Sequence, residues 1–300
     1  MNFAQEALII SRAELGRAVR SGRVVVLLGM YALFSLLALL GVGGFISFVR
    51  GQLQQQTGSD AAAAEALNAQ LSDSLMGIAI GDAAAASGGM SALPVVVLIV
   101  FRITLFFLPV YVALMGFDQL AGEMAPRSIR YLVVRARRES ILSGKFLVQA
   151  GLLIGLVLVV DLCITIYALV VEPDFPLGAA VPGLVKLWLA ASIFSLAYVA
   201  LTALCSAVTR SPAVSLALNF LLLLMFWLAD AIGSGRAALA KVAGEEAPAT
   251  AMLRYLSPSH YSTGLLDPDL SNFMVAVGAY AAFASLFMAL ALLALRVRDV

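Results

Sequence analysis

The sequence predicts an all-α protein that crosses a membrane six times. Its 300 residues are 62% hydrophobic and only 12% charged, with a mean hydropathy of +0.99, whereas soluble domains carry about a quarter charged residues. The apolar residues are gathered in runs of about 20, the length that an α-helix needs to span a bilayer. Because one soluble core cannot hide this much apolar surface, we expect a single transmembrane domain over residues 1–300.

Six segments have the length and composition of spanning helices. They comprise residues 24–48, 93–116, 146–171, 181–208, 213–232 and 273–295. Only Thr209–Pro212 separates the fourth segment from the fifth, and a tight helical hairpin is expected there, because proline suits the first turn of a helix but cannot continue the preceding one. The first run is too long for the apolar region of a cleaved signal peptide, so we predict that it is retained as a span.

The segment before the first span, residues 2–22, is moderately amphipathic. Apolar residues at helical spacing fall on one face, and arginines flank that face or lie opposite it. The apolar face comprises Ala4, Leu8, Leu15 and Val19. We therefore predict an N-terminal interfacial amphipathic helix whose arginines reach lipid phosphates.

The distribution of basic residues predicts the orientation. Thirteen of the 19 Lys and Arg residues fall on the side that holds both ends of the chain and the connection between the second and third spans, whereas four fall on the other side. The positive-inside rule places the richer side in the cytoplasm, so both termini are expected to be cytoplasmic. On the opposite side, residues 61–80 are predicted to form an amphipathic helix over the mouth of the bundle.

The composition argues against several classes of site. Cys163 and Cys205 lie inside apolar runs without a CxxC partner, and the single His260 is remote in sequence, so neither a metal site nor a disulfide is expected. A net charge of +1 provides no electrostatic reason to expect a nucleic-acid partner. The sequence contains no plausible Ser/His/Asp set or acidic pair, so an intramembrane enzyme is poorly supported.

The phosphate-binding motif GxxxxGK[ST] is also missing. Gly144-Lys145 does not complete it, because Glu139 stands where the first glycine is needed and Phe146 follows the lysine. We therefore expect no cofactor in this chain.

One charged stretch, FDQLAGEMAPRSIRYLVVRARRESILSGKFL, interrupts the apolar runs between Phe117 and Leu147. Pro126 disfavours one continuous helix through it and suits the first turn of a second short helix over residues 127–134, whose apolar residues recur at helical spacing. The stretch is therefore predicted to form two short helices along the cytoplasmic face of the membrane.

This stretch resembles the cytoplasmic loop after the second span of ABC-2-type permeases. These proteins are the membrane subunits of ATP-binding-cassette transporters with the six-span exporter fold. The similar pattern is Asp-x-x-Ala-x-Glu, then Ser-x-x-x-Leu, then a basic cluster, then Ile-Leu-x-Gly-Lys. It is formed by Asp118, Ala121, Glu123, Ser128, Leu132, Arg135, Arg137, Arg138, Ile141, Leu142, Gly144 and Lys145.

The resemblance implies that the stretch holds a coupling helix, which seats on a separate cytoplasmic ATPase that binds ATP and Mg²⁺. It also implies a permease homodimer with two ATPase subunits in the bacterial cytoplasmic (inner) membrane, working as an exporter. An ordinary basic loop that pairs with anionic lipid would explain the arginines but not the ordered spacing. The residues assigned to coupling are Asp118, Glu123, Pro126, Arg127, Ser128, Arg130, Arg135, Arg138 and Lys145.

The same resemblance leaves a second function open. A non-transporting membrane anchor of this fold would couple ATP hydrolysis to a periplasmic or envelope partner instead of moving a substrate. The two functions differ in whether substrate movement follows ATP turnover in reconstituted vesicles.

Two charged residues lie at similar depth in the second and third spans, Arg102 and Asp161. Because a lone charge at mid-membrane costs about 2.5–3.5 kcal/mol on insertion scales, an intramembrane ion pair is predicted. A direct substrate contact and the absence of pairing are the alternatives. Phe106, Tyr111 and Asn219 are candidates for a path taken by a lipid-like substrate, with lipid contact and helix packing as the alternative.

Overall fold

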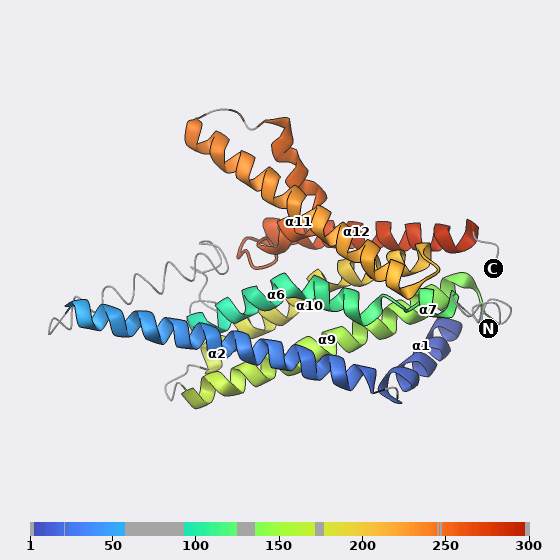
Figure 1. Ribbon diagram of the computed structural model, residues 1–300, viewed down its shortest axis with the longest axis horizontal. Helices are drawn as coiled ribbons and strands as arrows, with labels where there is room; N and C mark the ends of the chain where they lie inside the picture. The colour runs from blue at the N-terminus through green and yellow to red at the C-terminus, as the bar shows by residue number, and fades with distance from the viewer. Residues whose placement is uncertain are drawn as a thin grey trace.

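The computed structural model describes residues 3–20, 22–57, 93–124, 136–171, 177–244, 246 and 248–297. Within these ranges the chain is helical and contains no strand (Figure 1). The α-helices are α1 (Phe3–Arg20), α2 (Arg23–Thr57), α6 (Val95–Gly116), α7 (Ala121–Met124), α9 (Arg138–Val171), α10 (Leu177–Val208), α11 (Pro212–Ala243) and α12 (Leu270–Val297). Two 3-10 helices, η1 (Ala249–Leu256) and η2 (Pro258–Ser262), join α11 to α12.

Six helices of the described chain are long and apolar enough to span a membrane, which confirms the predicted fold class and number of spans. Their apolar stretches are Gly29–Val49, Val95–Met124, Arg138–Val170, Leu177–Val208, Pro212–Ala243 and Leu270–Val297. The helix ends differ most from the prediction in three places. α2 continues to Thr57 instead of ending near residue 48. α9 begins at Arg138 instead of near residue 146, and α11 continues to Ala243 instead of ending near residue 232. Hydropathy marks only the apolar part of a helix, whereas packing against neighbours also supports its polar turns.

Helix α10 lies at the centre of the bundle and packs against α6, α9, α11 and α12. Small residues make this position possible, because they allow helix backbones to approach one another closely. Ala190, Ala197, Ala200 and Ala203 are each at most 1% exposed. The short connection from α10 to α11 is the predicted hairpin, with Ser211 as N-cap and Pro212 in the first turn of α11.

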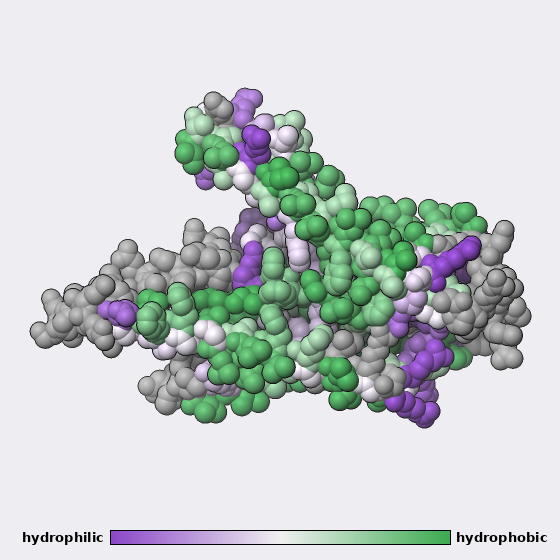
Figure 2. Space-filling view, viewed as in Figure 1, coloured by the Kyte–Doolittle hydropathy of each residue, from purple (hydrophilic) through white to green (hydrophobic). Residues whose placement is uncertain are grey.

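Helix α2 lies at the periphery and packs mainly against α6. Tyr31 and Leu39 are buried there, whereas Leu33, Leu37 and Leu40 are each more than half exposed. Figure 2 shows hydrophobic side chains over the middle of this face of the molecule. A bilayer is the solvent that suits such a surface.

The two ends of the bundle differ in composition. We call one the termini end; it holds α1, α7, the first turns of α9 and the last turns of α12 (Figure 1). Hydrophilic side chains gather there in Figure 2. The opposite end, called the far end, holds η2 and the start of α12. The predicted coupling helix at residues 127–134 and the predicted amphipathic helix at residues 61–80 lie outside the described residues.

The second half of α11 and η1 project from the bundle as a helical hairpin (Figure 1). The two elements are close because Gly233 has no side chain: a Cβ there would lie 2.4 Å from the backbone nitrogen of Arg254. α11 ends at Ala243 and is capped by Gly244, whose φ of 70° is left-handed and is tolerated best by glycine.

Candidate functional site

At the termini end, α1 docks on the first turns of α9 through Gly144. A Cβ at this position would lie 2.9 Å from Cγ2 of Ile10 and 3.0 Å from the carbonyl oxygen of Ala7. The hydroxyl of Ser11 donates to the carbonyl oxygen of Gly144 at 3.1 Å. Glycine is therefore what allows the two helices to approach this closely.

The face of α1 that docks on α9 differs from the predicted apolar stripe. Leu8, Leu15 and Val19 of that stripe are 67%, 43% and 56% exposed. The helix predicted for residues 2–22 is present as α1, and its exposed apolar residues leave the predicted membrane-interface role as a proposal.

Next to Gly144, Lys145 joins α1, α7 and α9 by ion pairs. Its ammonium lies 2.8 Å from Oε1 of Glu14 and 2.9 Å from Oε1 of Glu123. Arg17 lies 3.3 and 3.2 Å from the same two oxygens. We call these four residues the Lys145 cluster. Lys145 is only 3% exposed, and a lysine is rarely this buried unless it is paired.

Helix α7 is fixed to the rest of the bundle through backbone groups. The N–H groups of Leu120 and Ala121 donate to the hydroxyl oxygen of Ser206 on α10 at 2.8 and 2.9 Å. The side-chain amide of Gln119 donates to the carbonyl oxygen of Lys145 at 2.8 Å. The segment that enters residues 125–135 is thus bonded to both α9 and α10.

The start of α9 is also bonded to both ends of the chain. Glu6 of α1 accepts a hydrogen bond from the hydroxyl of Ser140 at 2.9 Å, and this bond lowers the pKa of the Glu6 carboxyl. Arg138 donates to the carbonyl oxygens of Leu295 and Arg296 at 2.6 and 2.9 Å. A cation is favourable at the last carbonyls of a helix, so Arg138 stabilises the end of α12.

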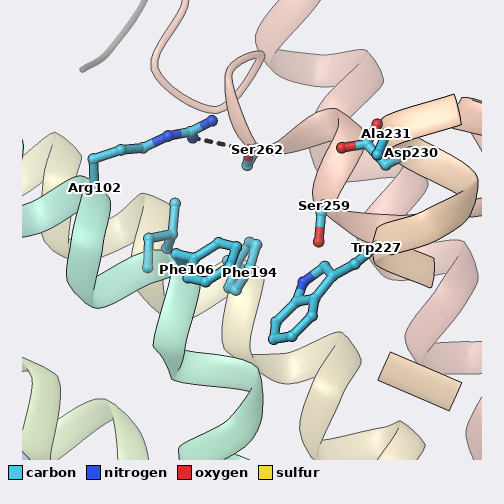
Figure 3. Close-up of a pocket in the computed structure, with 9 residues that line it drawn as sticks. Arg102, Phe106, Phe194, Trp227, Asp230, Ala231, Ser259 and Ser262 are labelled. Carbon is cyan, nitrogen blue, oxygen red and sulfur yellow. Dashed lines mark hydrogen bonds between the residues drawn. The ribbon is translucent and has the colours of Figure 1, made fainter. Parts of the chain in front are cut away.

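The far end contains a cavity of about 330 Å³ between α6, α10, α11 and η2 (Figure 3). One part of its lining is aromatic. Phe106 and Trp227 stack with ring centroids 4.9 Å apart and ring planes 10° apart. The residues that line the cavity are Arg102, Leu105, Phe106, Phe194, Trp227, Asp230, Ala231, Ser259 and Ser262.

The other part of the lining is polar and is positioned by η2. Figure 3 shows Arg102 reaching from α6 toward η2, where its guanidinium donates to the hydroxyl oxygen of Ser262 at 3.2 Å. Two buried tyrosines hold η2 against the bundle. The hydroxyl of Tyr198 bonds to that of Ser259, and the hydroxyl of Tyr280 donates to the carbonyl oxygen of Pro258, each at 2.7 Å.

Asp230 is the acidic residue in the lining, and it has two partners within the described chain. The hydroxyl of Ser234 donates to it at 3.3 Å, and Nδ1 of His260 lies 3.5 Å away. Partial burial lowers the pKa of His260 below its usual value, although Asp230 opposes this effect. At neutral pH the imidazole is therefore mainly neutral.

A family model described as ABC-2 family transporter protein matches residues 8–297. The chain belongs to the ABC-2 transporter family. The match runs from α1 to the last turn of α12, so it covers all six spans and confirms the resemblance inferred from the charged stretch. The comparison with curated proteins finds no matching relative. As a family member, the chain is a permease subunit of an ABC transporter, a membrane component that is generally not itself catalytic and that partners with an ABC ATPase subunit.

Four of the residues assigned to coupling in this ABC-2 permease lie in the described part of the chain. Asp118 precedes α7, and its carbonyl oxygen accepts from the N–H of Gly122 at 2.7 Å. Glu123 and Lys145 belong to the Lys145 cluster, and Arg138 bonds to the end of α12. Lys145 is buried within this cluster, and its part in coupling stays a prediction. The residues outside the described ranges are Pro126, Arg127, Ser128, Arg130 and Arg135.

The predicted ion pair between Arg102 and Asp161 is not formed, although the structure describes both residues. Arg102 bonds to Ser262, whereas Oδ2 of Asp161 is buried without a hydrogen-bond partner in the described chain. The prediction considered only depth in the membrane. Successive residues of a helix turn by about 100° around its axis, so two residues at equal depth can face different neighbours.

The three residues proposed for a substrate path do not share one site in the structure. Phe106 lines the cavity and is 54% exposed. Tyr111 is 7% exposed and packs on Tyr31 of α2, with ring centroids 4.9 Å apart. Asn219 is 1% exposed and donates to the hydroxyl oxygen of Thr202 at 2.8 Å, which links α11 to α10. The latter two residues therefore serve helix packing.

Sequence reasoning missed the residues that complete the cavity of this ABC-2 permease, namely Trp227, Ser259 and Ser262. A signal was present, because Trp227 and Asp230 are three residues apart and share one face of α11. The return of η2 toward α6 has no comparable local signal, because it depends on contacts between residues far apart in the sequence.

Proposed function

We propose that this permease subunit is an exporter that works as two copies with two cytoplasmic ATPase subunits, in a bacterial inner membrane with the termini end in the cytoplasm. The observation that carries the proposal is the arrangement at the termini end. Described segments on both sides of residues 125–135, α7 and the first turns of α9, are bonded to each other and to α1. The excess of Lys and Arg on this side supports the orientation.

This arrangement supports a mechanical role for the charged stretch. A push on residues 125–135 would reach α7 at one end and α9 at the other. α7 is bonded to α10 through Ser206, and α9 is bonded to α1 through the Lys145 cluster. Since α10 packs against four spans, a displacement of α7 and α9 would rearrange the whole bundle.

The proposed homodimer is supported by the apolar surface of α11. Leu224 and Leu228 are each 51% exposed near the middle of this helix, as are several of their neighbours. A second copy of the chain or lipid has to cover these side chains. The export direction is supported by the family resemblance.

Reconstitution with the cognate ATPase in vesicles tests the coupling role. The double variant Arg127→Glu, Arg130→Glu reverses two charges in the proposed docking segment, so we expect loss of ATPase binding and of stimulated ATP turnover. The control Arg236→Glu reverses an exposed charge on the projecting half of α11 and should leave both unchanged. Normal ATPase binding by the double variant would contradict the docking role.

The same vesicles separate export from anchoring. Movement of a co-purified amphiphile across the membrane that follows ATP turnover supports export. ATP turnover that responds only to an added envelope protein, without movement of any co-purified molecule, would replace export with the non-transporting anchor.

A further inference from the structure

The cavity at the far end combines a cation with a flat apolar wall. Arg102 lies in a membrane-spanning stretch, yet its guanidinium lies at the cavity beside the hydroxyl of Ser262. The stacked rings of Phe106 and Trp227 provide the apolar wall. The volume of about 330 Å³ falls within the range of about 300–1,000 Å³ that is usual for small-molecule sites.

The hydrogen-bond donors of the lining favour an anion. A guanidinium has five N–H donors, and in the described chain Arg102 makes a side-chain bond to one neutral hydroxyl and no ion pair with a carboxylate. Asp230, in contrast, already accepts from Ser234 and lies beside His260. Arg102 therefore keeps N–H donors that can bind an anion, whereas Asp230 already has two polar partners.

The site is held in place before any ligand binds. Tyr198 and Tyr280 are each 2% exposed and anchor η2 through their hydroxyl groups. The hydroxyls of Ser259 and Ser262 lie in the lining with Arg102. These groups can donate to the oxygens of a carboxylate or phosphate, and a ligand that meets a rigid donor set loses less free energy to ordering.

We propose that this cavity binds the anionic head of an amphiphile, a carboxylate or a phosphate, on Arg102, with the apolar part of the molecule along Phe106 and Trp227. A charge-assisted bidentate contact to the guanidinium would supply the recognition. The binding site stands on the geometry of this chain alone. Its assignment to the transported substrate rests on the proposed function.

The fluorescence of Trp227 is a direct probe of the cavity. The chain has two tryptophans, and Trp188→Phe leaves Trp227 as the sole reporter. The probe is dibrominated stearate, with its uncharged methyl ester as the matched control, added to the purified full-length protein. We expect saturable quenching by the stearate, with a half-saturation concentration at least about tenfold lower than that of the ester.

Three variants in this background decide the role of charge. Arg102→Gln should raise the half-saturation concentration of stearate by about tenfold or more, since a hydrogen bond to a charged group is lost. Asp230→Asn removes a nearby negative charge and should lower that concentration. Arg236→Gln changes an exposed arginine outside the cavity and should have no effect. Because the first two effects have opposite signs, general destabilisation cannot produce both.

Nanodiscs distinguish the two sources of such a ligand. If brominated phosphatidylglycerol quenches Trp227 more than brominated phosphatidylcholine, and Arg102→Gln removes the difference, the ligand is an anionic membrane lipid. If only free stearate shows the dependence on Arg102, the ligand is an amphiphile that enters from solution. Both outcomes support the anionic site.

Three results would overturn the proposal: equal quenching by stearate and its ester, unchanged binding in Arg102→Gln, or weaker binding in Asp230→Asn. None of these measurements uses an ATPase. Intact stearate binding without ATP-driven transport would therefore count against the proposed function alone. Normal ATPase coupling with no charge-dependent binding would count against this site alone.

Discussion

The buried ammonium of Lys145 should decide whether α1 stays docked. Lys145→Met keeps most of the side-chain volume and removes the charge. The carboxylates of Glu14 and Glu123, which now lie 2.8 and 2.9 Å from the ammonium, would then face each other without it. We therefore expect α1 to separate from α9 more often, because two like charges would be left at one partly buried site.

The magnitude follows from the burial of the partners. Removal of one member of a fully buried ion pair typically costs about 3–5 kcal/mol. Here the carboxylate side chains are 20% and 15% exposed, and Arg17 remains 3.3 and 3.2 Å from the same oxygens. Both facts reduce the loss, so we expect about 2 kcal/mol for the docking of α1, or about 30-fold in its opening equilibrium.

Hydrogen exchange of residues 3–20 in the purified protein measures this opening. Lys145→Met should raise the exchange of α1 by about 30-fold. Lys241→Met, which removes an exposed lysine at the end of α11, should not affect it. Adding Glu14→Gln to Lys145→Met should restore part of the protection, because one of the two like charges is removed. Equal exchange in Lys145→Met and the unmodified protein would refute the role given to the cluster.

Three further predictions concern close contacts and protonation. Gly144→Ala places a Cβ 2.9 Å from an α1 side chain and should reduce the free energy of α1 docking by about 1–3 kcal/mol. The loss is measured as faster hydrogen exchange of α1. Gly151→Ala is the control, because a Cβ there meets nothing within 4 Å. Gly233→Ala places a Cβ 2.4 Å from the η1 backbone and should raise exchange over residues 249–256, whereas Gly235→Ala, which has open space, should not. The folded-state pKa of Glu6 is lowered by its hydroxyl partner, so its contribution to α1 docking is present above about pH 4.3 and lost as the pH falls through the lower folded value. Glu6→Gln should remove that part of the pH dependence of α1 exchange, corrected for intrinsic rates.

The spans were predictable because each depends on local composition. A run such as residues 93–116 is apolar over the length of a bilayer, and its helix satisfies its own backbone hydrogen bonds. The ends of α9 and α11 were not predictable in the same way. The stretch from Arg138 to Lys145 is helical within a set of contacts with α1, α7 and α12, and hydropathy contains no information about those contacts.

The charged stretch shows what a residue pattern can and cannot indicate. The order Asp118, Glu123, Gly144, Lys145 resembled the ABC-2 family, and the family match confirmed the membership. The same resemblance assigned Glu123 and Lys145 to coupling but gave no information about their contacts. In the structure, these two side chains form an ion pair within the chain, and Gly144 allows the close approach of α1.

The sequence by itself determined that this protein is an all-α membrane protein with six spans and that it resembles ABC-2 permeases. The physical reason is that each apolar residue of a run contributes to the stability of a helix in the bilayer, so local composition is enough to identify a span. Only the tertiary structure decided that Arg102 bonds to Ser262 rather than pairing with Asp161, that Lys145 is buried, and that η2 completes a cavity with α6 and α11. These outcomes depend on the rotation of each helix about its axis and on the path of a distant loop, which packing between remote residues determines.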